Sequence, residues 1–438
     1  MLIRFNVSNY LSFDDVQSFT MIGGKTESHS DHMVSFDSIR LLKLSAIYGA
    51  NASGKTNFIK AITAMKNLVS HNESMISDSY HRSKPGNKEK PSLFEVELEL
   101  DGILYSYGFE IIISEKKIVD EWLHKLSLNE DSQMIFERNG DTVSHHFSGE
   151  DKSRIEIYAE DTVDQNNRLF LNVMGSRVRS KDVSLRIFAK VKKWFDDKLL
   201  ILDTNVPFIP AHYLDDDYFE KLNRYMASFG TGINRMGYET KEGMENLLPK
   251  EITEEMKKQL MEKNEDHIGM RNQSFASFVD YRISLSGNGS LVFDEIVFKH
   301  KNGITFRSNE ESDGTKKLFN LLANMIVDED DLTFIIDELD ARLHPQLTYH
   351  LVELFVKENI KKEKQLIFTT HESSLMDFQL LRRDEIWLTE KNNEGASSLY
   401  SLEDFNERND RKVEKAYREG RYGGIPIFST VFPYSEDQ

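Results

Sequence analysis

The chain has 438 residues, of which 39% are hydrophobic and 29% charged, a globular composition that excludes wholesale disorder. It contains no cysteine, which excludes disulfides, thiolate catalysis, zinc fingers and iron–sulfur clusters. The net charge of −18 argues against a surface that binds nucleic acid throughout, but a local basic groove stays compatible with it. No segment reaches about 18 consecutive apolar residues and the N-terminus does not resemble a secretory leader, so we expect a soluble cytoplasmic protein without a membrane span.

The first half of the chain predicts strands, one helix and an antiparallel hairpin. Residues 1–7 alternate in polarity, and residues 41–48 form a more apolar run, as expected for two strands. A glycine-rich turn then leads into a predicted helix over 55–69. Residues 92–112 alternate again around Asp101-Gly102, which predicts a hairpin with its turn at that dipeptide.

The second half predicts helices first and then an alternation of helices and strands. Apolar stripes at helical spacing lie in residues 183–200, 214–229 and 250–264. Strand-like runs return over 281–306, and from Ser312 onward helices and strands alternate as in α/β folds. No sustained heptads are present, so we predict that the middle of the chain is a compact helical insertion and not a coiled-coil arm.

A complete phosphate-loop motif, G-x-x-x-x-G-K-T, lies between the predicted strand and helix. Its glycines let backbone N–H groups wrap a phosphate, its lysine neutralises phosphate charge, and its threonine offers a hydroxyl to Mg²⁺. The alternative is an ordinary glycine turn after a strand. The Gly-Lys-Thr at 24–26 lacks the first glycine and is interpreted as a loop. The candidate nucleotide-binding residues here are Gly49, Asn51, Ala52, Ser53, Gly54, Lys55, Thr56 and Asn57.

Two acids, Asp337 and Glu338, follow the apolar strand predicted over 332–336. In P-loop ATPases, carboxylates at such a strand tip hold Mg²⁺ and orient the attacking water. Asp337 is therefore the candidate metal ligand beside Thr56, and Glu338 is the candidate catalytic residue. The alternative is a buried strand followed by a helix start, where acids are favoured anyway.

Two further segments extend the candidate site. His371 follows another apolar strand at 365–369 and is a second candidate catalytic residue, because a neutral imidazole can contact the γ-phosphate. Ser312 and Gly314 precede a helical run, where a hydroxyl and free N–H groups suit an anion. The alternatives are an exposed histidine and a simple N-cap by Ser312.

Taken in chain order, the four segments resemble the ABC-type ATPase heads of the RecF/SMC class, and Asn9-Tyr10-Leu11-Ser12-Phe13 is similar to the N-terminal segment of that class. The resemblance implies that Ser312-Asp313-Gly314-Thr315 is the signature motif, with Asp and Thr replacing the second and fourth residues of S-G-G-Q. It also implies that ATP is bound between two heads, with the serine and glycine of this motif reaching the partner's γ-phosphate. Gln133 and Gln165 are candidates for the Q-loop glutamine.

Within this class, residues 336–345 and 417–426 resemble the OLD family and the stand-alone ATPase subunits of PARIS-type anti-phage defence systems. That resemblance implies a homo-oligomer that holds a separate TOPRIM-type nuclease effector and releases it when a phage-encoded trigger protein binds. The chain after His371 is too short for a nuclease domain of its own, so we expect the effector to be another chain. Nucleic acid is an optional partner. The alternatives are a RecF-like DNA-binding ATPase of repair or recombination and a scaffold that binds ATP with negligible turnover.

We therefore predict an α/β fold, namely an ABC-type P-loop ATPase head with a mixed-sheet lobe, an antiparallel β lobe and a compact helical insertion. Residues 1–182 would hold the phosphate loop (Walker A) and the antiparallel lobe, and residues 183–280 the insertion. Residues 281–438 would hold the signature motif, Walker B, D-loop and His switch. The expected cofactors are ATP and Mg²⁺.

Two features remain outside this scheme. Residues 177–193 are strongly basic and could contact nucleic acid or an acidic trigger protein, although the solvated face of a helix is the alternative. His29-Ser30-Asp31-His32 and His145-His146 could ligate a metal, although ordinary surface histidines are the alternative.

Overall fold

The computed structural model forms two compact units. Unit 1 comprises residues 1–201, 330–340 and 359–438, and unit 2 comprises residues 202–329 and 341–358. Among the described residues, none of the helices could span a membrane. The residues that the structure describes are 1–26, 28–36, 39–127, 131–163, 165–178, 182–202, 216–262, 267–274, 277–405 and 413–425.

Unit 1 contains a six-stranded sheet in the order β11-β17-β18-β5-β19-β20. Strands β17, β18, β5 and β19 are parallel neighbours, and β20 runs antiparallel at the edge. Every residue of β5, β17 and β18 is buried, which is why these strands are nearly continuous apolar runs in the sequence. The strands are β5 (Leu44–Gly49), β11 (Leu199–Leu202), β17 (Thr333–Ile336), β18 (Gln365–Thr369), β19 (Ile386–Lys391) and β20 (Ser397–Ser401).

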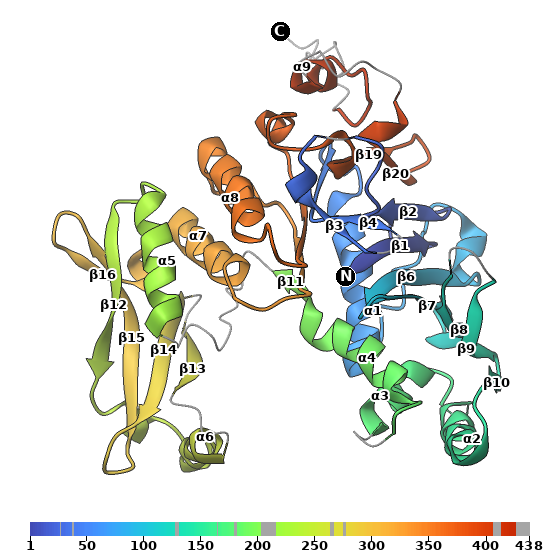
Figure 1. Cartoon of the computed structure of the whole chain (residues 1–438), viewed down its shortest axis with the longest axis horizontal. Coiled ribbons are helices and arrows are strands. Elements are labelled where there is room, and N and C mark those ends of the chain that lie inside the picture. Colours follow the sequence, from blue (N-terminus) through green and yellow to red (C-terminus); the bar gives the residue numbers. More distant parts are fainter. Residues whose placement is uncertain are drawn as a thin grey trace, which may run out of the picture. The chain divides into compact units, whose positions relative to one another are not determined.

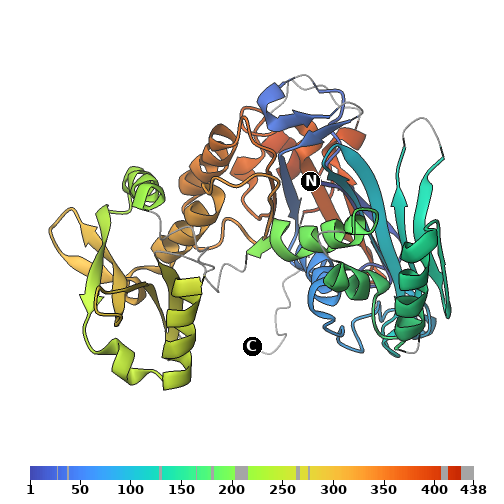
Figure 2. The same cartoon turned by 60° about the horizontal axis from the view of Figure 1, so that its bottom comes forward.

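A seven-stranded antiparallel sheet forms the second layer of unit 1, in the order β10-β9-β8-β7-β6-β1-β2. The N-terminal strand β1 lies between β6 and β2 (Figure 1), and Figure 2 gives a second view of the molecule. Asp101 and Gly102 form the turn between β6 and β7 with φ of 54° and 79°, so the predicted hairpin is confirmed. The strands are β1 (Leu2–Ser8), β2 (Gln17–Thr20), β6 (Ser92–Leu100), β7 (Ile103–Ile112), β8 (Lys117–Lys125), β9 (Gln133–Asn139) and β10 (Thr142–His145), and a separate pair is formed by β3 (Met33–Ser35) and β4 (Arg40–Leu42).

Helix α1 begins directly after the phosphate loop and joins the two sheets of unit 1 through one core. Its buried Phe58 and Ile62 belong to the same apolar cluster as Phe5 of β1 and Ile367 of β18. The two sheets therefore hold the start of α1, and with it the loop, in a fixed place. The helices of this unit are α1 (Lys55–His71), α2 (Gly149–Val163), α3 (Phe170–Arg177), α4 (Arg186–Lys193) and α9 (Val413–Arg418), with short 3-10 turns that include η1 (Ser30–His32) and η8 (Arg383–Glu385).

Unit 2 is built on an antiparallel sheet in the order β12-β15-β14-β13, with β16 added on β15 (Figure 1). Helix α5 packs on β12 and on α7. The strands are β12 (Ile233–Lys241), β13 (Ile268–Ser274), β14 (Ser277–Leu285), β15 (Leu291–His300) and β16 (Thr305–Arg307), and the helices are α5 (Asp216–Ser228), α6 (Lys250–Glu262), α7 (Asp313–Met325) and α8 (Pro345–Glu358).

The predicted fold class is confirmed, because the chain has an α/β fold with a mixed sheet and an antiparallel sheet lobe. The segment 183–280, predicted as a compact helical insertion, is not helical throughout. That range contains α4, α5 and α6, but also β11, β12, β13 and the start of β14. The three-part division of the chain stays a prediction.

Candidate functional site

The phosphate loop follows β5 and is held by packing against β19 and β20. At Gly49, an added Cβ would lie 2.4 Å from Oγ1 of Thr389 on β19. At Gly54, φ is 125° and an added Cβ would lie 2.6 Å from Oγ of Ser397 on β20. Only glycine fits both positions, so the two glycines of the motif are needed for close backbone packing as well as for the turn.

The ammonium group of Lys55 lies inside this loop. Its Nζ donates to the backbone oxygens of Gly49 (2.7 Å) and Ala50 (3.0 Å), and only 5% of the residue is exposed. Burial lowers the pKa of Lys55 to about 8, although Asp337 and Glu338 attract the charged form. Two backbone oxygens of the loop thus accept hydrogen bonds from Lys55, as phosphate oxygens could do in their place.

The two acids after β17 are positioned by one hydroxyl of the neighbouring strand. Thr369 is buried at the end of β18, and its Oγ1 donates to Oδ1 of Asp337 (2.5 Å) and accepts from the backbone N–H of Glu338 (2.8 Å). The backbone of Glu338 is left-handed, with φ of 50°. A non-glycine residue in that region is uncommon, and here it directs an exposed carboxylate away from the strand.

His371 lies beside Lys55, just beyond the end of β18. Its Nδ1 is 3.4 Å from Nζ of Lys55, and its backbone N–H lies 3.3 Å from Oδ1 of Asp340. Partial burial and the Lys55 ammonium lower the pKa of His371, which favours the neutral ring. A neutral ring can contact a phosphate group or a water molecule through either nitrogen.

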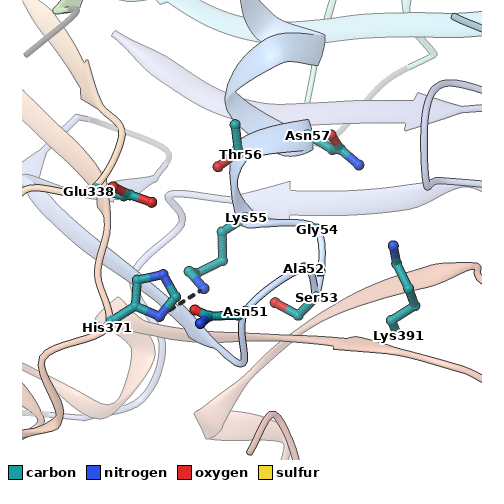
Figure 3. A pocket seen from close by; sticks show the side chains of 10 residues that line it. All are labelled: Asn51, Ala52, Ser53, Gly54, Lys55, Thr56, Asn57, Glu338, His371 and Lys391. Atoms are coloured by element: carbon teal, nitrogen blue, oxygen red, sulfur yellow. Dashed lines mark hydrogen bonds between the residues drawn. The ribbon is translucent and has the colours of Figure 1, made fainter. Parts of the chain in front are cut away.

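A pocket of about 500 Å³ brings the phosphate loop together with Glu338 and His371 (Figure 3). Glu338 and His371 flank the loop on one side in this view, and Lys391 lies on the other side. Lys391 was missed in the sequence, where the only signal is a charged residue at the end of an apolar strand. The pocket is lined by Asn51, Ala52, Ser53, Gly54, Lys55, Thr56, Asn57, Glu338, His371 and Lys391.

The N-terminal segment over residues 9–13, whose sequence resembles that of the RecF/SMC class, supports this loop from outside the pocket. Asn57 donates to Oγ of Ser12 (2.8 Å), and the backbone oxygen of Ser12 accepts from the N–H of Ser397 (2.7 Å). Ser397 in turn donates through Oγ to the backbone oxygen of Ser53 (2.6 Å). The segment therefore contributes to the shape of the loop although it does not line the pocket.

The chemistry of the pocket suits a nucleotide with Mg²⁺. The Thr56 hydroxyl and the Asp337 carboxylate are hard oxygen ligands of the kind that Mg²⁺ prefers. Lys55 and Lys391 supply positive charge for phosphates, and loop N–H groups at the start of α1 add the field of a helix N-terminus.

The predicted signature segment lies in unit 2, at the start of α7. Ser312 is the N-cap of this helix, and its Oγ accepts from the backbone N–H of Thr315 (3.1 Å). A Cβ added to Gly314 would lie 2.7 Å from the backbone oxygen of Arg342, so a side chain has no room there. Asp313 pairs with Lys316 (3.0 Å) and with Arg342 (3.4 Å). The N-cap alternative thus describes the local geometry, and the contact with a partner's phosphate stays a prediction.

The other candidates fall outside the pocket. Neither Gln133 nor Gln165 lines it, and the candidates Gly49 and Asp337 adjoin the lining residues without being among them. In the basic stretch, Arg177 covers the ring of Tyr158 at 4.7 Å from its centroid, and Lys190 pairs with Asp101. Lys192 is buried and pairs with Asp196 (2.7 Å), whereas Arg179 and Lys181 lie outside the described residues.

The sequence matches the family model described as "AAA domain, putative AbiEii toxin, Type IV TA system" over residues 44–197 and 258–377, which is more than half of the chain. The chain belongs to this family. It is thus a P-loop ATPase of a family linked to toxin–antitoxin systems.

No curated protein matches the sequence. Among solved structures, the chain is similar to the SMC head domain from Thermotoga maritima, with 13% identity and a TM-score of 0.38 over 91% of this chain and 98% of that chain. It is also similar to an SmcHead bound to the C-winged helix domain of ScpA, with 13% identity and a TM-score of 0.41 over 92% of this chain and 99% of that chain.

Proposed function

We propose that this chain is the ATP-binding and ATP-hydrolysing subunit of an anti-phage defence system. The observation that carries the proposal is that the phosphate loop, Glu338 and His371 line one common pocket. Membership of a family described as "AAA domain, putative AbiEii toxin, Type IV TA system" supports the link to defence.

In this proposal, six side chains in and beside the pocket each have one task. Lys55 turns from the loop carbonyls to the β- and γ-phosphates, and Lys391 adds charge at the opposite side. Thr56 and Asp337 hold Mg²⁺, which neutralises phosphate charge when it is bound. Glu338 accepts a proton from the attacking water as the general base. His371 remains neutral and contacts the γ-phosphate.

The assembly is proposed from the resemblance in the sequence. Two heads would enclose ATP, with Ser312 and Gly314 of one chain facing the γ-phosphate bound by the other. The resulting homo-oligomer would hold a separate TOPRIM-type nuclease, and a phage-encoded protein would trigger its release. A RecF-like role on DNA is less well supported, because Arg177, Lys190 and Lys192 contact side chains of the chain itself.

Two variants test the nucleotide site. Lys55→Ala removes the cation at the phosphates and should abolish ATP binding in a titration with a fluorescent ATP analogue. Lys60→Ala, which removes an exposed lysine from the same helix, is the matched control and should bind normally. Normal affinity in the Lys55 variant would disprove the assignment of this pocket.

Glu338→Gln should bind ATP but hydrolyse it at least 100-fold more slowly, because the amide cannot accept the proton of water. Hydrolysis at the wild-type rate would mean that another group is the base. Purification of this variant together with the product of a neighbouring gene tests the defence role. An ATP-dependent complex with a small nuclease is the expected result, whereas a partner from DNA repair would favour the RecF-like alternative.

A further inference from the structure

Three side chains that can ligate a metal meet around the 3-10 turn η1, in unit 1. His29, Asp31 and His32 each offer one ligand atom, and these atoms lie within 4.8 Å of one another. Among the residues that the structure describes, no other group of three histidines or acids has this property. His29 and Asp31 reach the surface, and His32 is 4% exposed.

Both imidazoles are oriented by hydrogen bonds from one ring nitrogen. Nε2 of His29 lies 2.8 Å from the backbone oxygen of Phe378, and Nδ1 of His32 lies 2.9 Å from Oε1 of Glu385. A carbonyl oxygen can only accept, so Nε2 of His29 carries the proton and Nδ1 keeps its lone pair. Nδ1–H of His32 likewise donates to the carboxylate of Glu385, which leaves the lone pair of Nε2 in that ring for a ligand. Metal-bound histidines usually have such a partner on the second nitrogen.

The carboxylate behind His32 is itself fixed. Glu385 is completely buried, and its Oε2 accepts from the backbone N–H of Arg382 (2.7 Å). Arg382 pairs with Asp384 (2.7 Å) and donates to the backbone oxygen of Thr26 (2.8 Å). The turn with the three side chains is therefore attached to η8 by a buried polar network, which restrains His32 beside the other two ligands.

We propose that His29, Asp31 and His32 form a binding site for a divalent transition metal of the Zn²⁺ type. Two neutral imidazoles and one carboxylate are the ligands of three-residue zinc sites, which leave the fourth position open. Mg²⁺ prefers oxygen ligands only, so this site differs in chemistry from the pair Thr56 and Asp337. It also lies elsewhere, because Glu385 precedes β19, whereas the phosphate loop follows the end of β5, which runs parallel to β19.

A bound ion would fasten the N-terminal segment to the start of β19. His29 reaches the segment before η8 through Phe378, and His32 reaches Glu385 at the end of η8. The ion would restrain both rings at once and so add to the stability of the folded chain.

The test is a calorimetric titration of the full chain with Zn²⁺, without nucleotide and after treatment with a chelator. Wild-type protein should bind one equivalent, and Co²⁺ should give the absorption bands of a four-coordinate ion. Asp31→Asn and His29→Gln alter side chains that reach the surface, so they keep the fold, and each should weaken binding at least 10-fold. The matched control is His145→Gln with His146→Gln, a histidine pair in another part of the same unit, which should bind as the wild type does.

Thermal unfolding supplies a second readout. Zn²⁺ should raise the unfolding midpoint of the wild type and of the control but not that of the two site variants, while all four proteins unfold at the same temperature in chelator. No binding by the wild type would overturn the proposal. So would equal affinity in the site variants, because the ion would then be bound elsewhere, for example at the oxygen ligands near Lys55.

Discussion

At the scale of single residues, Thr369 connects the two acids on which hydrolysis is proposed to depend. Its hydroxyl holds Asp337 and the backbone of Glu338 at once, and it is not part of the pocket lining. Thr369→Val keeps the shape of the buried side chain but leaves an N–H and a carboxylate oxygen without this partner, at a cost of about 1–3 kcal/mol. We expect steady-state ATPase assays to show kcat roughly 5- to 100-fold lower, with a smaller change in KM.

Thr369→Ser keeps the hydroxyl and should restore most of this activity. If the valine variant turned over ATP as fast as the wild type, Thr369 would have no positioning role. A variant that loses ATP binding and hydrolysis to the same extent would indicate a disturbed loop instead.

Lys55 gives the site a pH dependence of known sign. Its pKa of about 8 in the free protein lies below the ordinary value of 10.5, because burial disfavours the charged form. Only the ammonium attracts phosphate, so ATP affinity should fall by about 10-fold between pH 7 and pH 9 as Lys55 loses its proton. Binding titrations across this range measure the effect.

Lys55→Arg provides the control for that slope, since a guanidinium stays charged throughout the range. Its affinity should be nearly independent of pH whatever its absolute value. An equally steep decrease in the arginine variant would assign the pH dependence to another group.

At the scale of elements, Glu121 of β8 determines where helix α3 begins. Its buried carboxylate accepts from the backbone N–H groups of Phe170 (2.6 Å) and Leu171 (2.9 Å) and from the hydroxyl of Tyr107 (3.1 Å). Glu121→Ala leaves both N–H groups buried without this acceptor. We expect it to reduce the free energy of unfolding by about 2–4 kcal/mol in urea denaturation, whereas Glu115→Ala, at an exposed position, should change little.

Burial raises the pKa of Glu121 to about 7, so the folded chain binds more protons than the unfolded chain between pH 4.5 and pH 7. The contribution of this group to stability should therefore decrease as pH rises through that range. The alanine variant should lack this component, and identical pH profiles in the two proteins would contradict the assignment.

The same scale shows which elements a sequence can predict. Strands β5, β17 and β18 are buried on both sides, so their apolar runs predicted the strands. The polar residues that follow each run predicted the residues of the candidate site. Strand β12 was missed because its buried residues are Ile233 and Met236, three positions apart, with a register shift between Ile233 and Arg235. That irregularity removes the alternation on which a strand prediction depends.

Contacts between segments that are distant in the sequence could not be predicted from the sequence pattern either. Nothing in the local pattern of Lys391 indicates that it lines the same pocket as Lys55, because the pairing of β19 with β5 brings them together. The support of the loop by Ser12 and Ser397 depends on three segments that are far apart in the sequence.

At the scale of the whole molecule, the proposed ATP-bound dimer makes Ser312 part of a site that one chain cannot complete. Serine, asparagine and aspartate are all good N-caps, so Ser312→Asn and Ser312→Asp should both preserve α7. The two variants differ in charge, and a carboxylate facing a partner's γ-phosphate would repel it. In the Glu338→Gln background, light scattering with ATP should therefore show dimers for Ser312→Asn but monomers for Ser312→Asp. Dimers in both variants would mean that Ser312 acts only as a helix cap. Monomers in the parent Glu338→Gln protein would contradict the ATP-bound dimer itself.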